Sequence, residues 1–165
     1  MRLFFLRHGK AEEHSASLRD YDRRLTGEGI EEMKRAASGL ATIVDGMDIV
    51  VSSPLPRALE TARIAATALK LPEDRLVVSD KLASGAFGIG ELQAILAKTP
   101  VDRRVLLVGH EPDFSIVVRR LTGAAIEMKK AGLALVECDR PEPDSGVLCW
   151  LLTSRHLQSL ARGTG

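Results

Sequence analysis

The sequence has few cysteines, no long apolar run and almost no excess of charge. Its two cysteines, Cys138 and Cys149, cannot build a disulfide framework, and two small buried thiols in a reducing compartment are expected. No apolar stretch approaches the ~20 residues of a membrane-spanning helix, and the first residues lack the apolar side chains of a signal peptide. With 23 basic and 22 acidic residues, the net charge of +1 indicates no broad basic face for nucleic acid. We therefore expect a cytoplasmic protein that binds neither membranes nor nucleic acid.

Internal repeats, low-complexity tracts and long linkers are also missing from the sequence. A length of 165 residues suits one core, so we expect a single domain over residues 1–165 that is a monomer or a weak dimer. The metal-binding spacings HExxH and CxxC do not occur, and we expect neither a metal nor a cofactor.

Strand-like and helix-like patterns alternate along the chain. Short apolar runs predict strands at 2–6, 48–52, 75–78, 105–108, 132–138 and 146–152. Helical spacing predicts helices that begin near Thr26, Ser53 and Pro112, and two more over 89–98 and 155–161. Alternation of this kind favours an α/β domain with a mostly parallel sheet of about six strands, made mixed by a C-terminal hairpin.

Three of the predicted strands are followed by side chains that carry nitrogen. Arg7 and His8 follow the first strand, Arg57 lies in the first turn of the helix after the second, and His110 follows the fourth. If these strands are neighbours, the four side chains converge at the carboxyl ends of the sheet, where ligands of such folds bind. Two helix N-termini would add N–H groups and partial positive charge. The pattern predicts a pocket for a small dianion, with phosphate as the candidate.

Such a pocket could also perform phosphoryl transfer. Arginine suits bidentate contact with phosphate oxygens, and a histidine can act as the nucleophile through a covalent phosphohistidine. The attacking ring must be neutral, and a hydrogen bond to its second nitrogen fixes the tautomer. An unperturbed pKa of ~6.5 leaves a large neutral fraction near pH 7, and surrounding cations would lower the pKa further.

Four ordered motifs carry a resemblance to the histidine phosphatase superfamily, the phosphoglycerate mutase-like fold: "RHG" (7–9), "LTGEG" (25–29), "SSPLPRALETA" (52–62) and "GHEP" (109–112). The resemblance runs from residue 2 to about 122. It implies a three-layer α/β/α architecture, His8 as the phosphorylated nucleophile, and Arg7, Arg57 and His110 as ligands of the phosphoryl group.

The short length and the segment "RDYDRRLTGEG" look most like the small SixA-type phosphohistidine phosphatases. Members of this type lack the lid segments of the mutases, which implies a shallow, open site that suits a phosphorylated side chain on a partner protein. The resemblance therefore implies a phosphohistidine phosphatase. A phosphatase for a small phosphate ester and a non-catalytic phosphate-binding module are the alternatives.

The glutamate that protonates the leaving oxygen in many family members has no clear counterpart. Ser84 or Gly85 falls at its place, and Glu111 occupies the slot where acid phosphatases of the family carry an aspartate. Either Glu111 or a nearby carboxylate (Asp80 or Asp113) is the acid, or no acid is needed because imidazole is a good leaving group. The plain alternative for Glu111 is a carboxylate that stabilises its helix N-terminus.

Three further residues are candidates for contact with substrate. Gly9 would let the backbone turn sharply and approach a phosphate closely. Lys10 is either a rim charge or a solvated loop residue, and Ser84 begins a glycine-rich stretch that would line the pocket. Cys149 and Arg155 have the C-x5-R spacing of cysteine-dependent phosphatases, but the apolar strand residues between them cannot form an anion-binding loop.

Overall fold

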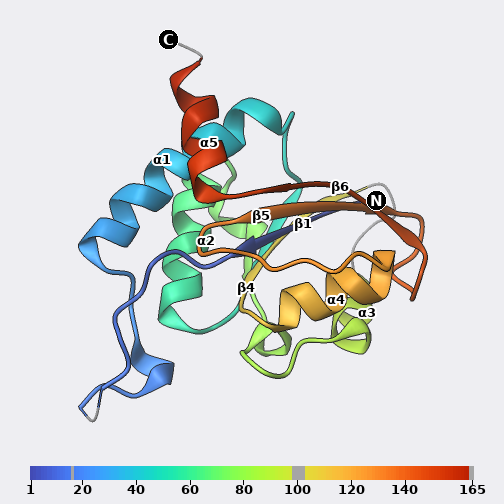
Figure 1. Cartoon of the computed structure of the whole chain (residues 1–165), viewed down its shortest axis with the longest axis horizontal. Helices are drawn as coiled ribbons and strands as arrows, with labels where there is room; N and C mark the ends of the chain where they lie inside the picture. The colour runs from blue at the N-terminus through green and yellow to red at the C-terminus, as the bar shows by residue number, and fades with distance from the viewer. Residues whose placement is uncertain (16, 98–102, 164–165) are drawn as a thin grey trace.

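The protein is built on one six-stranded sheet. The computed structural model describes residues 1–15, 17–97 and 103–163 (Figure 1). The strand order is β3-β2-β4-β1-β5-β6. Neighbouring strands pair in parallel from β3 to β1, whereas the β1–β5 and β5–β6 pairs are antiparallel. The strands are β1 (Arg2–Arg7), β2 (Ile49–Ser52), β3 (Leu76–Val78), β4 (Arg104–Gly109), β5 (Leu133–Cys138) and β6 (Gly146–Leu152). The predicted α/β class and mixed sheet are confirmed.

Helices cover both faces of this sheet and make the three layers (Figure 1). One face carries α1 (Gly27–Ile43), α2 (Pro56–Ala68) and α5 (Ser154–Arg162), and the other carries α3 (Ile89–Leu96) and α4 (Asp113–Thr122). Side chains of β1 alternate between two cores because successive residues of a strand point to opposite faces. Phe4 and Leu6 pack with α1, whereas Leu3 and Phe5 pack with α4.

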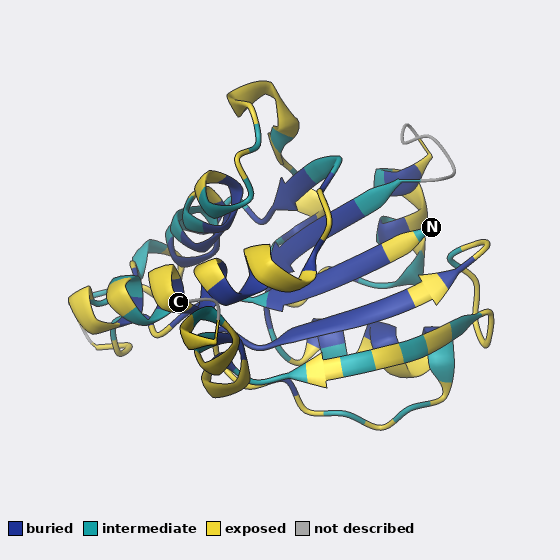
Figure 2. Ribbon diagram, turned by 90° about the horizontal axis from the view of Figure 1, so that it is seen from above, coloured by how far each residue is buried: buried dark blue, intermediate teal, exposed yellow. Residues whose placement is uncertain are grey.

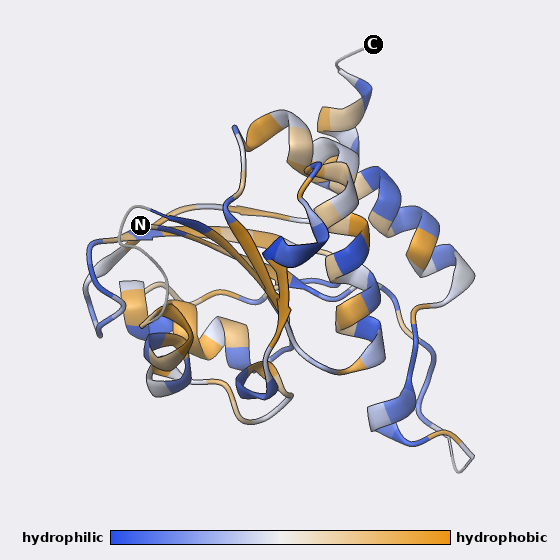
Figure 3. Ribbon diagram, turned by 180° about the vertical axis from the view of Figure 1, so that it is seen from behind, coloured by the Kyte–Doolittle hydropathy of each residue, from blue (hydrophilic) through white to orange (hydrophobic). Residues whose placement is uncertain are grey.

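Burial and hydropathy follow the same division. Figure 2 shows the central strands as buried, while β6 at the edge alternates between intermediate and exposed residues. Cys138 is buried as predicted, but the prediction is wrong for Cys149, which is exposed because it lies on this edge strand. Figure 3 shows the strands as a hydrophobic layer with polar residues gathered on the outer helices and loops. Among the described residues, no helix is both long enough and apolar enough to cross a membrane.

The start of α1 is fixed against the segment that follows β1. Thr26 caps the helix as predicted, because its side chain accepts a hydrogen bond from the Gly29 N–H. The Thr26 N–H donates to the Lys10 carbonyl at 3.0 Å, and a Cβ on Gly29 would lie 2.1 Å from the same oxygen. A side chain at position 29 would therefore push the first turn of α1 away from the "RHGK" segment.

The predicted start of α2 is wrong by about three residues. Ser53 does not cap this helix, which begins at Pro56 with Leu55 as the capping residue. The Ser53 N–H donates to the Val108 carbonyl on β4 at 2.9 Å, and the Ser53 hydroxyl contacts His110. Ser53 therefore prolongs the pairing of β2 with β4, and the proline that opens the helix is Pro56.

Smaller differences concern element ends and loops. Three short 3₁₀ helices occur at η1 (Asp20–Asp22), η2 (Glu73–Arg75) and η3 (Asp80–Leu82). Helix α3 ends at Leu96, and residue 98 of the helix predicted over 89–98 lies outside the described residues. Residues 11–15 and 17–25, here called the arm, have the polar and charged composition that predicts a surface loop. The arm contains η1 and is closed at its base by an Ala11–Leu25 bridge.

Candidate active site

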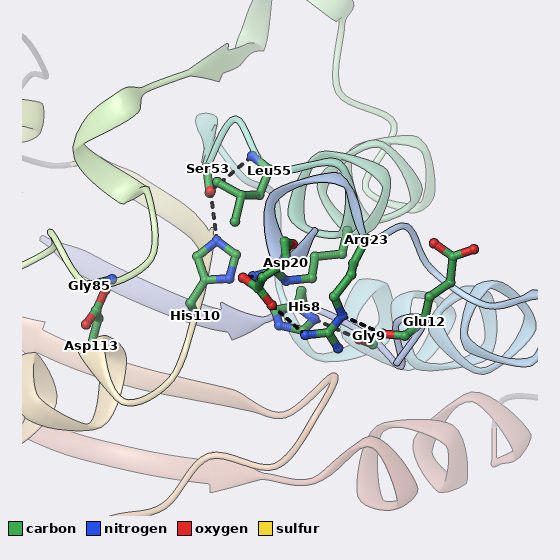
Figure 4. Close-up of polar contacts among 11 residues, drawn as sticks. His8, Gly9, Glu12, Asp20, Arg23, Ser53, Leu55, Gly85, His110 and Asp113 are labelled. Atoms are coloured by element: carbon green, nitrogen blue, oxygen red, sulfur yellow. Dashed lines mark hydrogen bonds and ion pairs between the residues drawn. The ribbon is translucent and has the colours of Figure 1, made fainter. Parts of the chain in front are cut away.

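The predicted site forms where three parallel strands end side by side. Strand β4 lies between β1 and β2, so their carboxyl ends are neighbours. The rings of His8 and His110 are 5.2 Å apart between centroids and inclined at 55°. The charges of Arg7 and Arg57 act on both rings. The structure thus brings together the four side chains whose convergence the sequence predicted, and Figure 4 shows the two histidines.

His8 presents a neutral ring with one free nitrogen. Its Nδ1 lies 2.8 Å from the Gly9 carbonyl oxygen, which can only accept, so Nδ1 carries the hydrogen and Nε2 carries a lone pair. Burial of the ring lowers the pKa of His8 to about 3, and the charges of Arg57 and Arg7, with that of His110 when it is protonated, act in the same direction. A neutral imidazole with an unprotonated nitrogen is the state that nucleophilic attack requires.

His110 is equally buried but is held by a side chain rather than a carbonyl. Its Nε2 lies 2.8 Å from the Ser53 hydroxyl oxygen, and its Nδ1 is buried without a hydrogen-bond partner among the described residues. Burial, reinforced by the charge of Arg57, lowers the pKa of His110 to about 4. Both rings of the site are therefore uncharged at neutral pH.

The two arginines are each anchored through terminal nitrogens. Arg57 donates from Nη1 to the Asp20 carbonyl at 2.6 Å and from Nη2 to the Asp20 carboxylate at 3.1 Å. Arg7 donates from Nη1 to the Met128 carbonyl at 2.7 Å. Both Nε atoms are buried and have no partner in the described part of the chain. Each guanidinium is thus fixed at one edge, with the hydrogen-bonding capacity of its Nε unused.

Unused nitrogen atoms single out this place in the molecule. Over the described residues, the buried side-chain nitrogen or oxygen atoms without a partner are Arg7 Nε, Arg57 Nε and His110 Nδ1, and all three belong to this cluster. Buried polar atoms are almost always paired, because an unpaired one costs about 1–3 kcal/mol. A ligand with several acceptor oxygens and negative charge, such as a phosphoryl group, would pair them.

Four residues that the sequence interpretation did not assign to the site support it: Ser53, Asp20, Arg23 and Thr61. Thr61 in α2 accepts a hydrogen bond from the Gly9 N–H at 3.1 Å and donates to the Arg57 carbonyl at 2.7 Å, so it joins two motifs. Arg23 donates to the Asp20 carboxylate at 2.7 Å. The opposite charges of Asp20 and Arg23, three residues apart, were the available signal that the arm is structured.

The candidate substrate contacts have different surroundings. Gly9 does not adopt a left-handed backbone, and the chain has no turn or bend at residues 8–10, so the predicted sharp turn is not found. A Cβ there would meet Leu25 Cδ2 at 3.3 Å, so packing against the arm also favours glycine at this position. Lys10 is exposed and forms an ion pair with Glu28. Ser84 is exposed, and the adjacent Gly85 N–H donates to a carboxylate of α4.

The candidate acids have their described contacts away from the two histidine rings. Glu111 Oε1 accepts hydrogen bonds from the Ser115 hydroxyl at 2.7 Å and the Met128 N–H at 3.3 Å. Asp113 is buried and accepts from the Gly85 N–H at 2.7 Å, while Asp80 is exposed in η3. Since the Met128 carbonyl accepts from Arg7, Glu111 braces the residue that anchors a site arginine.

Comparison with known proteins agrees with this geometry. A model of the histidine phosphatase superfamily (branch 1) matches residues 3–93, more than half of the chain. The chain belongs to the histidine phosphatase superfamily. An uncharacterised protein of Picosynechococcus sp. is 32% identical over 142 residues, which is 81% of this histidine phosphatase and 82% of that protein.

Solved structures share the fold of this histidine phosphatase. The protein histidine phosphatase SixA, complexed with tungstate, matches with a TM-score of 0.82 and 27% identity over 95% of this chain and 99% of that one. The α-ribazole phosphatase from Shigella flexneri matches with a TM-score of 0.70 and 18% identity over 93% and 97%. The phosphoglycerate mutase-like fold and the SixA-like character predicted from the sequence are confirmed, and the protein is a phosphatase.

Proposed function

We propose that this histidine phosphatase removes phosphoryl groups from phosphohistidine on a partner protein, through a covalent intermediate on His8. Nε2 of His8 attacks phosphorus, and the P–N bond to the substrate imidazole breaks. The departing imidazole takes a proton from solvent. Water then attacks the phosphoryl group on His8, which releases inorganic phosphate and restores the neutral ring. The unpaired nitrogens of Arg7, Arg57 and His110 bind the phosphoryl oxygens throughout.

The position of Glu111 is the observation that carries the choice of substrate. An alkoxide leaving group needs a proton donor, whereas an imidazole with a pKa of ~6.5 can leave without a dedicated acid. The Oε1 atom of Glu111 accepts hydrogen bonds from Ser115 and Met128, which ties this carboxylate to α4 and to the loop before β5. A site whose candidate acid Glu111 is tied to Ser115 and Met128 suits a phosphoramidate. The likeness to SixA, a protein histidine phosphatase, supports the same class.

A panel of substrates tests the proposal. We expect kcat/KM for a phosphohistidine-bearing protein to exceed that for sugar and glycerate phosphates by at least about 100-fold, the range that general acid catalysis typically contributes. His8→Asn should abolish turnover of every member of the panel. A preference for an alkyl phosphate monoester would overturn the phosphohistidine assignment and leave a small-molecule phosphatase in its place.

A further inference from the structure

Ser53 is buried and makes only two described contacts through its hydroxyl. The oxygen accepts a hydrogen bond from the Leu55 N–H at 3.2 Å and lies 2.8 Å from His110 Nε2. Its exposed fraction is 0%, so water cannot supply another partner. The hydroxyl belongs to the residue after β2, and His110 follows β4, the neighbouring strand.

The hydrogen of this hydroxyl determines the tautomer of His110. The Leu55 amide can only donate, so within the described residues His110 Nε2 is the acceptor available to the Ser53 hydroxyl. If Nε2 carried a hydrogen instead, the buried hydroxyl hydrogen would have no acceptor, which is costly. The neutral ring of His110 therefore carries its hydrogen on Nδ1.

That hydrogen faces the site. Figure 4 shows Nε2 directed at Ser53 and the other ring nitrogen on the side of His8 and Asp20. Nδ1 is one of the buried atoms without a described partner. We propose that Ser53 is a positioning residue that holds His110 as the Nδ1–H tautomer, so that a neutral ring donates a hydrogen bond to a phosphoryl oxygen.

The opposite tautomer would work against the proposed function, on which this inference rests. An Nε2–H ring would turn a lone pair toward the phosphoryl oxygens and repel them. A protonated ring would donate from Nδ1, but it would place a buried positive charge 5.2 Å from the ring that must stay neutral to attack. The Ser53 hydroxyl supplies the donor without the charge.

The experiment is histidine ¹⁵N NMR on the full-length protein, paired with tungstate binding by calorimetry. The wild type should show His110 protonated on Nδ1 and unprotonated on Nε2. Ser53→Ala should move the hydrogen to Nε2 and weaken tungstate binding roughly 10- to 100-fold, the loss expected for one hydrogen bond to a charged group. Ser52→Ala is the matched control, because this buried hydroxyl donates to the Ser53 carbonyl and should leave both readouts unchanged.

The wild-type spectrum tests the tautomer of His110 even if Ser53→Ala does not fold. A wild-type His110 that is protonated on Nε2 would overturn the proposal, as would a Ser53→Ala protein with the wild-type tautomer and wild-type tungstate affinity. Neither readout uses a phosphorylated substrate. A wrong substrate assignment would therefore appear in the substrate panel and leave the tautomer result standing.

Discussion

At the scale of single residues, the site consists of two buried, uncharged histidine rings and two arginines. The Nε atoms of both arginines are buried without a hydrogen-bond partner among the described residues. His8 and His110 are 6% and 2% exposed, and their pKa values fall to about 3 and about 4, mainly because burial disfavours the charged ring. In the unfolded chain both rings would titrate near ~6.5. Folding is therefore coupled to pH through the same side chains that the proposed chemistry uses.

Stability should fall as the pH drops from about 6.5 toward 4. In this window the unfolded chain binds protons that the folded protein does not, so acid favours unfolding, and stability is fully present above the unfolded pKa. Each histidine contributes up to about 1.4 kcal/mol per pH unit to the slope of the unfolding free energy against pH. His8→Asn should flatten the profile, measured by urea unfolding at pH 4.5 and pH 7.

The exposed His14 provides the control, because His14→Asn should have the same pH dependence of stability as the wild type. An unchanged slope in His8→Asn would mean that the folded protein accommodates a charged His8, against the burial argument.

Glu111 should act through its hydrogen bonds rather than as a proton donor. Gln retains an acceptor oxygen for Ser115 and the Met128 N–H, so Glu111→Gln should lower kcat/KM less than about threefold. Glu111→Ala should raise KM, because Met128 holds Arg7. The measurement compares a phosphoramidate with an alkyl phosphate. A loss in Glu111→Gln confined to the alkyl ester would restore Glu111 as the acid.

At the scale of elements, the arm brings a negative charge to the anion site. Hydrogen bonds from Arg23, together with Arg57, hold the pKa of Asp20 below its ordinary value, so its carboxylate is ionised at neutral pH. This carboxylate contacts Arg57 Nη2 at 3.1 Å. Figure 1 shows the arm at the carboxyl ends of the parallel strands, beyond β1. The arm therefore anchors Arg57, and its carboxylate would repel an anion at the proposed site.

Removal of this charge should strengthen anion binding. Asp20→Asn keeps the backbone carbonyl on Arg57 Nη1 and removes a negative charge beside the site, so the Kd for tungstate should fall about three- to tenfold. Asp22→Asn is the control, because Asp22 lies in the same η1 and pairs with Arg19. Weaker binding in Asp20→Asn, measured by calorimetry, would mean that its orientation of Arg57 outweighs its charge.

The packing of α1 against α5 depends on one glycine. A Cβ on Gly39 would lie 1.7 Å from the Leu157 carbonyl oxygen, whereas a Cβ on Gly27 at the start of α1 would meet nothing within 4 Å. Gly39→Ala should lower the free energy of unfolding by about 1–3 kcal/mol or more. Gly27→Ala should be neutral or slightly stabilising. Equal unfolding free energies for the two variants would contradict the close helix contact.

At the scale of the whole molecule, the sheet order is what makes a site from distant motifs. Local patterns predicted the strands, and the α/β rule placed Arg7, His8, Arg57 and His110 at one edge of the sheet. Ser53 was misread because its local sequence favours a helix cap, while its partner lies 57 residues away. Such contacts depend on strand order and register, which a single sequence does not specify.

Contacts of the arm escaped prediction for a related reason. Its charged residues are typical of a solvated loop, and their spacing does not reveal that Asp20 reaches Arg57, 37 residues along the chain. The Thr61 contact with Gly9 spans 52 residues and likewise depends on how α2 packs beside β1. Sequence thus predicted which four side chains converge, whereas the residues that orient them required the structure.

The central claim is that His8 carries the phosphoryl group during turnover. The most direct measurement is a brief pulse with a phosphohistidine substrate, an alkaline quench, and mass spectrometry of the peptide that contains His8. We predict phosphate on His8 that is stable to base and labile to acid, and none in His8→Ala. A His8→Ala protein with near wild-type turnover, or phosphate on another residue of the wild type, would contradict the account.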